Sequence, residues 1–352
     1  MGMMETSNFA PVDRVFLTGG TGYLGKHLVR EFLAAGYELL LLTREDSDRS
    51  GLPLGGIRYV EGDLLDPSSY RQVLGEVGAV VHSAGLVSRW EKDKNLFDRV
   101  NVEALDSLLH ACEEAHVGRV VYTSSFFVLG PGEDDAPRNE TQRMPVAGFN
   151  DYDRTKILAE RCVKEHRRRG LDIISLLPTV IYGPGARTQG NHVAEILEDL
   201  LQQKLPGLIG SGDQVWNYVY VSDAARGHRL ALEKGQACAD YLLGGENASM
   251  ARFLELAAEL GEVSAPTRHV PFALLMAVAR LQMLRAKLTG KAPELTSGMV
   301  RSYQYDWAFD DAKAQRELGY QGRPLREGLR ETIGWLRKGG TSPFRDERWE
   351  FQ

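Results

Sequence analysis

Cysteine is scarce in this sequence, and neither sign of charge is in large excess. The three cysteines, Cys112, Cys162 and Cys238, lie far apart without CxxC or Cys/His spacing, which argues against a disulfide framework and gives no sign of a metal site. The net charge of −6 arises from interspersed residues of both signs, so no basic surface is offered to nucleic acid. The first 11 residues lack the basic start and apolar run of a secretory signal. We therefore expect a cytoplasmic protein that binds neither metal nor nucleic acid.

Residues 18–25 (TGGTGYLG) form a glycine-rich segment between two apolar patterns. A short apolar run precedes the segment, and large apolar residues recur at helical spacing after it. This order predicts a strand, a tight turn at Gly19, a close pyrophosphate approach at Gly22 and helix–strand packing at Gly25. The helix N-terminus would then direct its unpaired N–H groups at the phosphates. The segment predicts dinucleotide binding, although its first glycine gap is one residue longer than in the usual fingerprint.

The second apolar run, residues 38–43, is followed by an arginine and not by a carboxylate. Folds that prefer NAD place Asp or Glu at this strand end to bind the ribose 2′-hydroxyl. Arg44 instead suits a 2′-phosphate, which a carboxylate would repel. We therefore expect NADP(H) to be favoured over NAD(H). If Arg44 is only a solvated loop charge, NAD(H) remains open.

Further apolar runs cover residues 57–60, 79–82 and 119–123, and a long helix is expected from about residue 95 to 115. Strands that are apolar throughout are typical of a parallel sheet covered on both faces. The run at 79–82 ends in His82, which we expect to be packed and hydrogen-bonded and not catalytic. The small residues directly after it allow a loop to lie close to a ligand.

Tyr152 and Lys156 are four residues apart in a helical pattern, so both project from one face of the helix. A nearby ammonium favours the phenolate form of a tyrosine and lowers its pKa. Such a tyrosine can exchange a proton with a carbonyl or alcohol oxygen while a nicotinamide exchanges hydride with the carbon. Ser125, expected on the loop after the strand at 119–123, would donate a second hydrogen bond to that oxygen.

The order of these motifs resembles that of the extended short-chain dehydrogenases/reductases of the NAD-dependent epimerase/dehydratase superfamily, over residues 14–336. The similarity is carried by TGGTGYLG, GDLLD at 62–66, HSAG at 82–85 and LPTVIYGPG at 177–185, together with the catalytic set above. With Arg44 added, the cofactor residues that it implies are Thr18, Gly19, Gly22, Tyr23, Leu24, Gly25, Arg44, Asp63, Leu64, Ser83, Ala84, Gly85, Asn101, Tyr152, Lys156, Pro178 and Val180.

Within that family, the chain is most similar to the branch of dihydroflavonol 4-reductases, 3β-hydroxysteroid dehydrogenase-like proteins and hopanoid-associated sugar epimerases. The similarity rests on Arg44, VVYTSS at 120–125, YLLGGEN at 241–247 and a helical insert after Pro271. Leu177 stands where many sugar-modifying relatives carry arginine. The branch implies NADP-linked reduction of a ketone or aldehyde, or oxidation of the corresponding alcohol.

The ligand of such a fold lies beyond the carboxyl ends of the strands. The residues expected there are apolar or aromatic, namely Leu86, Trp90, Phe126, Phe127, Phe149, Trp216 and Tyr218. This wall favours an apolar or aromatic substrate. A nucleotide sugar would require diphosphate-binding charges, for which Arg187, His192 and Arg268 are the only obvious candidates. Phe126 and Phe127 also replace the acidic pair that sugar dehydratases of this family carry, which argues against dehydration.

Residues 272–291 begin with eight apolar residues and continue with several arginines and lysines. The stretch predicts an amphipathic helix that is too short and too charged to span a bilayer. Packing over the substrate cleft is the favoured interpretation. The alternative is peripheral contact with a membrane surface.

Together these patterns predict an α/β protein with a doubly wound parallel Rossmann sheet and a smaller C-terminal substrate-binding part. Residues 11–183 and 217–243 are expected to bind NAD(P), residues 184–216 and 244–338 to bind the substrate, and residues 339–352 to form a loosely ordered tail.

The predicted activity is NADP(H)-dependent reduction of a ketone or aldehyde of an apolar or aromatic small molecule, or oxidation of the alcohol. One alternative is an NAD(P)-dependent nucleotide-sugar epimerase or dehydrogenase, which would use the same catalytic residues. The other is a non-catalytic NADPH-binding sensor or assembly protein, a kind that tends to lose the Tyr/Lys pair. Because the helices that contain Asn101 and Tyr152 form the dimer interface in many relatives, the resemblance also implies a homodimer.

Overall fold

The computed structural model describes residues 13–132, 136–144, 148–185 and 188–340. Three expectations from the sequence therefore fall wholly or mostly outside the described residues. They concern the N-terminal segment, Arg187 and the tail after residue 340.

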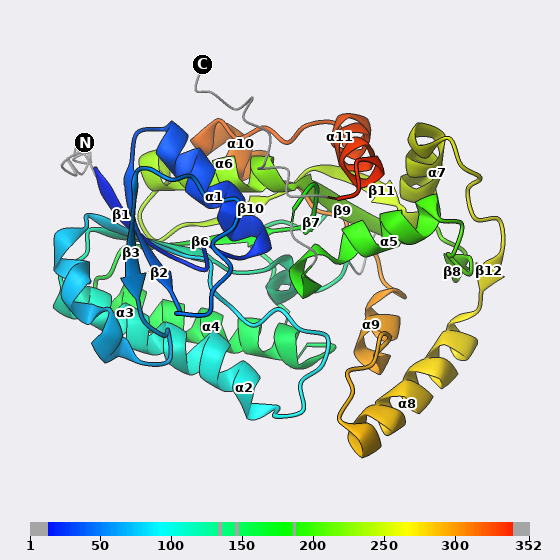
Figure 1. The fold of residues 1–352 in the computed structure, drawn as a ribbon, viewed down its shortest axis with the longest axis horizontal. Helices are drawn as coiled ribbons and strands as arrows, with labels where there is room; N and C mark the ends of the chain where they lie inside the picture. The colour runs from blue at the N-terminus through cyan, green and yellow to red at the C-terminus, as the bar shows by residue number, and fades with distance from the viewer. Residues whose placement is uncertain (1–12, 133–135, 145–147, 186–187, 341–352) are drawn as a thin grey trace.

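A parallel sheet of seven strands forms the centre of the larger part of the molecule (Figure 1). Its strands are β1 (Arg14–Thr18), β2 (Glu38–Thr43), β3 (Ile57–Glu61), β4 (Ala79–His82), β5 (Arg119–Thr123), β6 (Ile173–Pro178) and β10 (Asp240–Leu243). Their order in space is β10-β6-β5-β4-β1-β2-β3, so the winding reverses between β1 and β4. This is a Rossmann arrangement, which places a ligand at the carboxyl ends of the strands beside that switch point. The predicted fold class is confirmed.

Helices cover both faces of this sheet, as the buried strands between its edges require. In Figure 1, one layer lies above the sheet and the other below it. The upper layer contains α1 (Tyr23–Ala34), α6 (Val221–Lys234) and α10 (Ala312–Leu318). The lower layer contains α2 (Asn95–Asp98), α3 (Ala104–Glu114) and α4 (Asp151–Arg168).

The helix expected over residues 95–115 is interrupted. A π-helical turn, Arg99–Glu103, separates α2 from α3 and contains Asn101, whose side chain is buried. Such a turn inserts one extra residue into a helix and often marks a functional site. Sequence periodicity did not reveal it, because one inserted residue shifts the apolar pattern by less than a third of a turn.

A second, smaller sheet lies beyond the end of the first. It contains β7 (Val180–Tyr182), β9 (Val215–Tyr220) and β11 (Glu246–Ser249), in the order β11-β9-β7. The helices α5 (His192–Leu201), α7 (Met250–Gly261) and α11 (Leu325–Arg337) lie around it (Figure 1). Its core is rich in aromatic side chains, including Trp216, Trp307 and Phe309.

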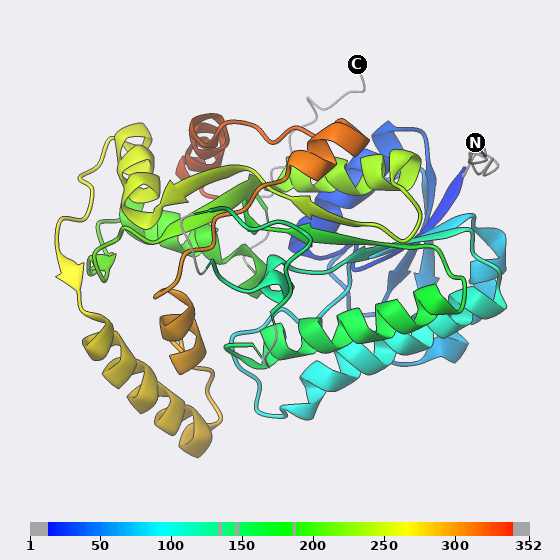
Figure 2. The same cartoon turned by 180° about the vertical axis from the view of Figure 1, so that it is seen from behind.

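The segment after α7 leaves this body through a two-residue strand pair, β8 (Leu208–Ile209) with β12 (His269–Val270). It then forms α8 (Phe272–Thr289) and returns through α9 (Ser297–Ser302). Figure 2 shows α8 beside α9 and apart from both helix layers of the large sheet. Among the described residues, no helix combines the length and apolar character needed to cross a membrane.

Candidate active site

The glycine turn after β1 is formed by close backbone contacts. Gly19 has a φ of +77°, and an added Cβ there would lie 2.5 Å from the Ala84 backbone nitrogen. A Cβ at Gly25 would lie 1.9 Å from the Gly19 carbonyl oxygen, so only glycine lets α1 pack this close to the turn. Gly22 precedes α1, and no side chain caps the first N–H groups of that helix. Free N–H groups at a helix N-terminus beside a glycine turn fit a pyrophosphate.

The loops after β1 and β4 are joined by hydrogen bonds through Thr18. Its hydroxyl lies 2.8 Å from Nδ1 of His82 and accepts a hydrogen bond of 3.2 Å from the Ala84 N–H. Burial and, to a smaller extent, the positive charge of Lys156 lower the pKa of His82 to about 3, so the ring is neutral. His82 is therefore a packed, hydrogen-bonded residue, as the sequence predicted. This bonding fixes Ser83, Ala84 and Gly85 alongside the glycine turn.

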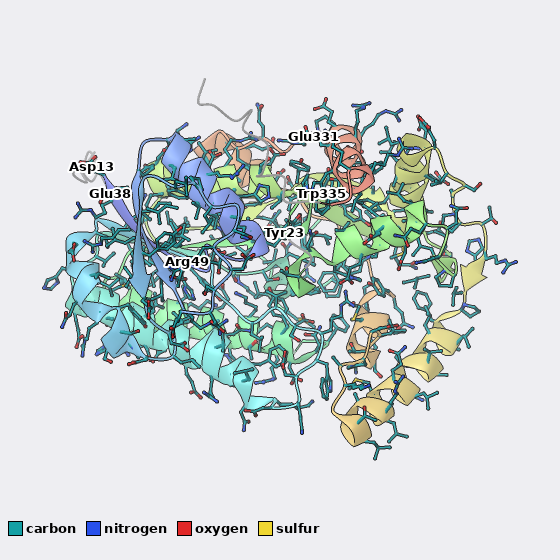
Figure 3. The ribbon with its side chains drawn as sticks, viewed as in Figure 1. Asp13, Tyr23, Glu38, Arg49, Glu331 and Trp335 are labelled. Atoms are coloured by element: carbon teal, nitrogen blue, oxygen red, sulfur yellow. The ribbon has the colours of Figure 1, made fainter. Side chains whose placement is uncertain are left out.

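Tyr23 and Leu24 open α1 and are more than nine-tenths buried. The Tyr23 hydroxyl donates a hydrogen bond of 3.1 Å to the Gly183 carbonyl, and its ring lies against Gly185. Figure 3 shows Tyr23 at the end of α1 that faces the second part of the molecule. The contact ties the cofactor-side helix to the segment that follows β7. The predicted contact of Tyr23 and Leu24 with a cofactor stays a prediction.

An open hollow of about 420 Å³ lies at the carboxyl ends of β2 and β3. Its lining combines one arginine with four carboxylates and a glycine: Arg44, Glu45, Asp46, Glu61, Gly62 and Asp63. The Arg44 side chain is 67% exposed and lies 3.5 Å from the Asp46 carboxylate. Arg49, labelled in Figure 3 on the loop after β2, bonds to Thr43 and lies over the Tyr59 ring instead. Arg44 and Asp63, two predicted cofactor residues, therefore share one hollow.

Tyr152, the predicted catalytic tyrosine, lies in the first turn of α4. The Asn150 side chain caps this helix by accepting a hydrogen bond of 3.0 Å from the Asp153 N–H. The Ser125 hydroxyl lies close enough to the Tyr152 phenol to act on its pKa, so the predicted pair lies together. Burial raises the pKa of Tyr152 to about 12, and the Ser125 hydroxyl opposes this shift. The phenol is therefore protonated at neutral pH and holds a proton that it can donate.

Lys156 lies one turn after Tyr152 and is buried. Its ammonium donates a hydrogen bond of 2.8 Å to the Thr123 carbonyl and one of 3.3 Å to the Tyr122 hydroxyl. Burial lowers the pKa of Lys156 to about 8, and the Glu160 carboxyl opposes this shift. Tyr122 also lies beneath the ammonium, which is 4.9 Å from the ring centre. These contacts hold the lysine at the end of β5, one helical turn from Tyr152.

Asn101 connects the π-helical turn to the loop after β4. Its side-chain oxygen accepts a hydrogen bond of 2.7 Å from the Leu86 N–H, and its amide donates one of 3.1 Å to the Leu86 carbonyl. The same amide donates to the Thr155 hydroxyl on α4. The extra residue in the turn directs this side chain at both elements at once. Asn101 therefore holds the HSAG loop against α4.

An aromatic cluster lies directly against Tyr152. The Phe127 ring meets Tyr152 edge-on at 6.3 Å and Trp307 at 5.0 Å between ring centres. Phe149 contacts Trp307 at 5.8 Å. Phe127 and Phe149 are only partly buried, as are Leu86 and Trp90. These four of the seven predicted substrate residues have surface that a ligand can reach.

The other three predicted substrate residues are more than nine-tenths buried. Phe126 and Trp216 pack around Trp307 at the centre of the cluster. Tyr218 stacks on Phe253 at 4.3 Å, within the core of the second part. In this structure they support the aromatic wall from behind, and their contact with a substrate stays a prediction.

Sequence reasoning missed Tyr303 and Trp307, which come from the segment after α9. Trp307 is fully buried and contacts Phe126, Phe127, Phe149 and Trp216. Nothing in the local periodicity assigned this segment to the site, because it reaches the cluster through isolated bridges to residues distant in the sequence, among them Trp216. A cluster of aromatic residues between 302 and 309 was the only available signal.

The cations considered for a diphosphate do not converge. His192, at the start of α5, lies 3.3 Å from the Tyr303 hydroxyl and also 3.3 Å from the Glu195 carboxylate. Arg268 lines a separate hollow beyond the other end of α5, together with Leu205 and Pro206. Within the described ranges, no three His, Cys, Asp or Glu side chains are placed to hold a metal ion.

Comparisons with known proteins agree with this geometry. The model of the NAD dependent epimerase/dehydratase family matches residues 15–244. Sterol demethylase protein B of Methylococcus capsulatus is 29% identical over 330 residues, which cover 92% of this chain and 98% of that protein. A 4-hydroxy-2-methyl-3-oxo-4-farnesyl-3,4-dihydroquinoline-1-oxide ketoreductase of Stigmatella aurantiaca is 28% identical over 88% of this chain and 92% of its own length. The crystal structure of gox2253 is similar with a TM-score of 0.80 and 30% identity, covering 93% of this chain and 99% of that one.

Proposed function

Because the chain belongs to the NAD dependent epimerase/dehydratase family and is an NAD(P)-dependent oxidoreductase, we propose a carbonyl reduction as its reaction. The proposed substrate is a ketone or aldehyde of an apolar or aromatic small molecule, or the corresponding alcohol in the oxidising direction. The proposed cofactor is NADP(H). The observation that carries the proposal is the contact of Ser125, Tyr152 and the partly exposed Phe127 at one point of the site. It brings a proton donor and an aromatic surface together beside the end of β5.

The residues around the glycine turn fit a dinucleotide. A Cβ at Gly22 would meet only the Gly19 carbonyl oxygen, at 3.2 Å, which leaves the uncapped N-terminus of α1 open to a phosphate. When bound, the nicotinamide supplies or accepts the hydride. In the proposed division of the chain, residues 11–183 and 217–243 hold the cofactor, and residues 184–216 and 244–338 hold the substrate.

The proposed roles of the catalytic residues follow from their contacts. Ser125 donates a hydrogen bond to the carbonyl oxygen of the substrate and orients it. Tyr152 donates its phenolic proton to that oxygen as negative charge develops there. Lys156, held at the end of β5 by Thr123 and Tyr122, directs its ammonium at the cofactor ribose. Asn101 is a positioning residue that holds Leu86 and Thr155 in place.

The proposed preference for NADP(H) rests on Arg44, whose exposed guanidinium has only a weak surface pairing with Asp46. The four carboxylates of the same hollow oppose a 2′-phosphate and favour NAD(H) as the alternative cofactor. In the Arg44→Ala variant, we expect the ratio of kcat/KM with NADPH to kcat/KM with NADH to fall about tenfold or more, the scale of one charge-assisted hydrogen bond. An unchanged ratio would remove Arg44 from cofactor selection.

The test of the activity is NADPH and NADH oxidation against aryl aldehydes, cyclic ketones, steroid ketones and nucleotide 4-keto sugars. We expect turnover of an apolar carbonyl with NADPH, lowered by roughly two to four orders of magnitude in Tyr152→Phe. The relatives named as a sterol demethylase protein and a farnesyl-quinoline ketoreductase support the choice of apolar compounds. No turnover of any apolar carbonyl would contradict the proposal.

A nucleotide-sugar epimerase is the second candidate, because the family description includes epimerases and the catalytic residues would be shared. The separation of His192 and Arg268 disfavours it. Tight binding of a nucleoside diphosphate in calorimetry would support it instead.

A cytoplasmic location and a homodimer through the helices that contain Asn101 and Tyr152 complete the proposal. A monomer in sedimentation analysis would remove the dimer.

A further inference from the structure

The outward face of α8 carries a stripe of apolar side chains. Ten large hydrophobic residues of the described chain are exposed, and five of them lie on this one helix. They are Leu274 (56% exposed), Val278 (39%), Leu281 (69%), Leu284 (55%) and Leu288 (80%). Their spacing of three and four residues aligns them along one side of a helix. Side chains of α8 project away from the rest of the molecule in Figure 3.

The opposite face of α8 is the one that packs on the protein. Ala279 and Ala286, one heptad apart, are almost fully buried there. This corrects the expectation of an amphipathic helix with one apolar side, because α8 is apolar on both its inner and outer faces. The outer stripe is a second apolar surface that no described part of the chain covers.

The charge around the stripe is positive throughout. Arg280 and Lys287 lie two turns apart along one edge, Arg285 lies near the other edge, and Lys291 follows the end of the helix. No acidic residue occurs between Glu262 and Glu294, in a chain whose net charge is −6. Within the described ranges, none of these four cations forms an ion pair. An apolar stripe with flanking cations is the pattern of a helix that lies in the interface of an anionic bilayer.

The place of α8 connects this surface to the site. The backbone N–H of Leu295 donates a hydrogen bond of 2.9 Å to the side-chain oxygen of Gln282 on α8. On α9, Arg301 donates one of 3.0 Å to the Phe149 carbonyl, and Gly298 packs against the same carbonyl. Phe149 lies three residues before Tyr152. A partner surface bound to α8 would therefore lie on the same side of the molecule as the predicted substrate site.

We propose that the outward face of α8 docks the protein onto an anionic lipid membrane, with Leu281, Leu284 and Leu288 entering the apolar layer and Arg280, Lys287 and Lys291 contacting acidic headgroups. A second copy of the chain fits this face less well. Two α8 helices packed through their stripes would bring arginines and lysines together, and residues 271–293 contain no carboxylate to pair with them. The proposal does not depend on the reaction that the active site performs.

The test measures flotation of the full chain with vesicles of phosphatidylglycerol and phosphatidylcholine, and with vesicles of phosphatidylcholine alone. We expect binding to the anionic vesicles only, weakened by high salt because the headgroup contacts are screened. The double variants Leu281→Gln/Leu288→Gln and Arg280→Glu/Lys287→Glu should each lower the partition coefficient at least about tenfold. Both pairs are exposed, and circular dichroism verifies that each variant folds.

Leu54→Gln is the matched control, since Leu54 is fully exposed far along the chain from α8. It should bind vesicles as the parent protein does. Equal binding by the parent and both α8 double variants would overturn the proposal, as would absence of binding to anionic vesicles. Sedimentation equilibrium supplies the remaining outcome. A dimer that Leu281→Gln/Leu288→Gln converts to a monomer, without vesicle binding by either, would assign the stripe to a second copy and also overturn the proposal.

Discussion

The predicted active site, at the carboxyl ends of the strands of the large sheet, and the helix α8 differ in the polarity and the burial of their side chains. In the predicted active site, polar side chains such as Thr18, Asn101 and Lys156 are buried, and each has hydrogen-bond partners at 2.7–3.3 Å. On α8, apolar side chains such as Leu281 and Leu288 are more than two-thirds exposed. Burial of polar groups and exposure of apolar groups are both unfavourable in water, so each region carries a cost in folding free energy.

The difference indicates what each region is organised to meet. Buried polar groups with fixed partners lose little further freedom when a ligand binds, so they suit precise placement of reacting atoms. An exposed apolar stripe makes no directional contacts, and its binding free energy comes only from removing apolar surface from water. The first region therefore matches a small molecule, and the second matches an extended apolar surface.

The largest expected effect separates the regions by chemistry. Tyr152→Phe should lower turnover of a water-soluble carbonyl substrate by roughly two to four orders of magnitude, because the general acid is lost. Tyr305→Phe is the matched control, since Tyr305 is a partly exposed tyrosine that contacts Phe149. Leu281→Gln/Leu288→Gln should also leave this turnover unchanged. Steady-state kinetics measure all three variants, and near-normal turnover of Tyr152→Phe would show that another group supplies the proton.

The next effect separates the regions by stability. Leu28, on α1, is fully buried in the core of the large sheet, whereas Leu288 is 80% exposed. Leu28→Ala should lower the free energy of unfolding by about 2–5 kcal/mol, the cost of a core cavity. Leu288→Ala should change it by less than about 0.5 kcal/mol. Urea denaturation measures both, and a large loss for Leu288→Ala would mean that α8 buries this side chain in solution.

The smallest effect concerns pH. Because burial lowers the pKa of Lys156 to about 8, the folded protein loses this proton at lower pH than the unfolded chain does. The unfolded state therefore binds more protons above pH 8, and this lysine raises the free energy of unfolding as pH increases from about 8 to 10. Removing it in Lys156→Met should flatten that rise by about 1–3 kcal/mol. The comparison uses urea denaturation at several pH values.

Lys287→Met on α8 is the control for this pH effect, because the Lys287 side chain lies on the exposed helix. It should retain the pH dependence of the parent protein. An unaltered pH dependence in Lys156→Met would show that Lys156 titrates alike in the folded and unfolded chains.

Much of the predicted active site could be derived from the sequence because it depends on residues at short, fixed spacings. The glycines of the first turn, the strand ends and the four-residue step from Tyr152 to Lys156 are local patterns, and the fold places them together by sheet order. The π-helical turn at Asn101 could not be predicted, since one inserted residue barely alters the periodicity. Trp307 could not be assigned to the aromatic cluster, because its contacts bridge some 180 residues of chain to Phe126 and Phe127.

The sequence also indicated the helix over 272–291, but not which of its faces would pack on the protein. Both faces are apolar, so the periodicity does not indicate the buried face, which tertiary contacts determine. Those contacts bury Ala279 and Ala286 and leave the leucines outward. Small residues face the protein because α9 lies close beside α8.

The most direct measurement of the central claim is the fate of the transferred hydride. The protein would be supplied with NADPH carrying deuterium at C4 of the nicotinamide, each face being labelled in turn, together with an apolar ketone that supports turnover. We expect mass spectrometry to find one deuterium at the carbinol carbon of the product for one of the two labels, with one NADP⁺ formed per product. Product formed without deuterium from either label, or an isomerised product without net oxidation of NADPH, would contradict the account.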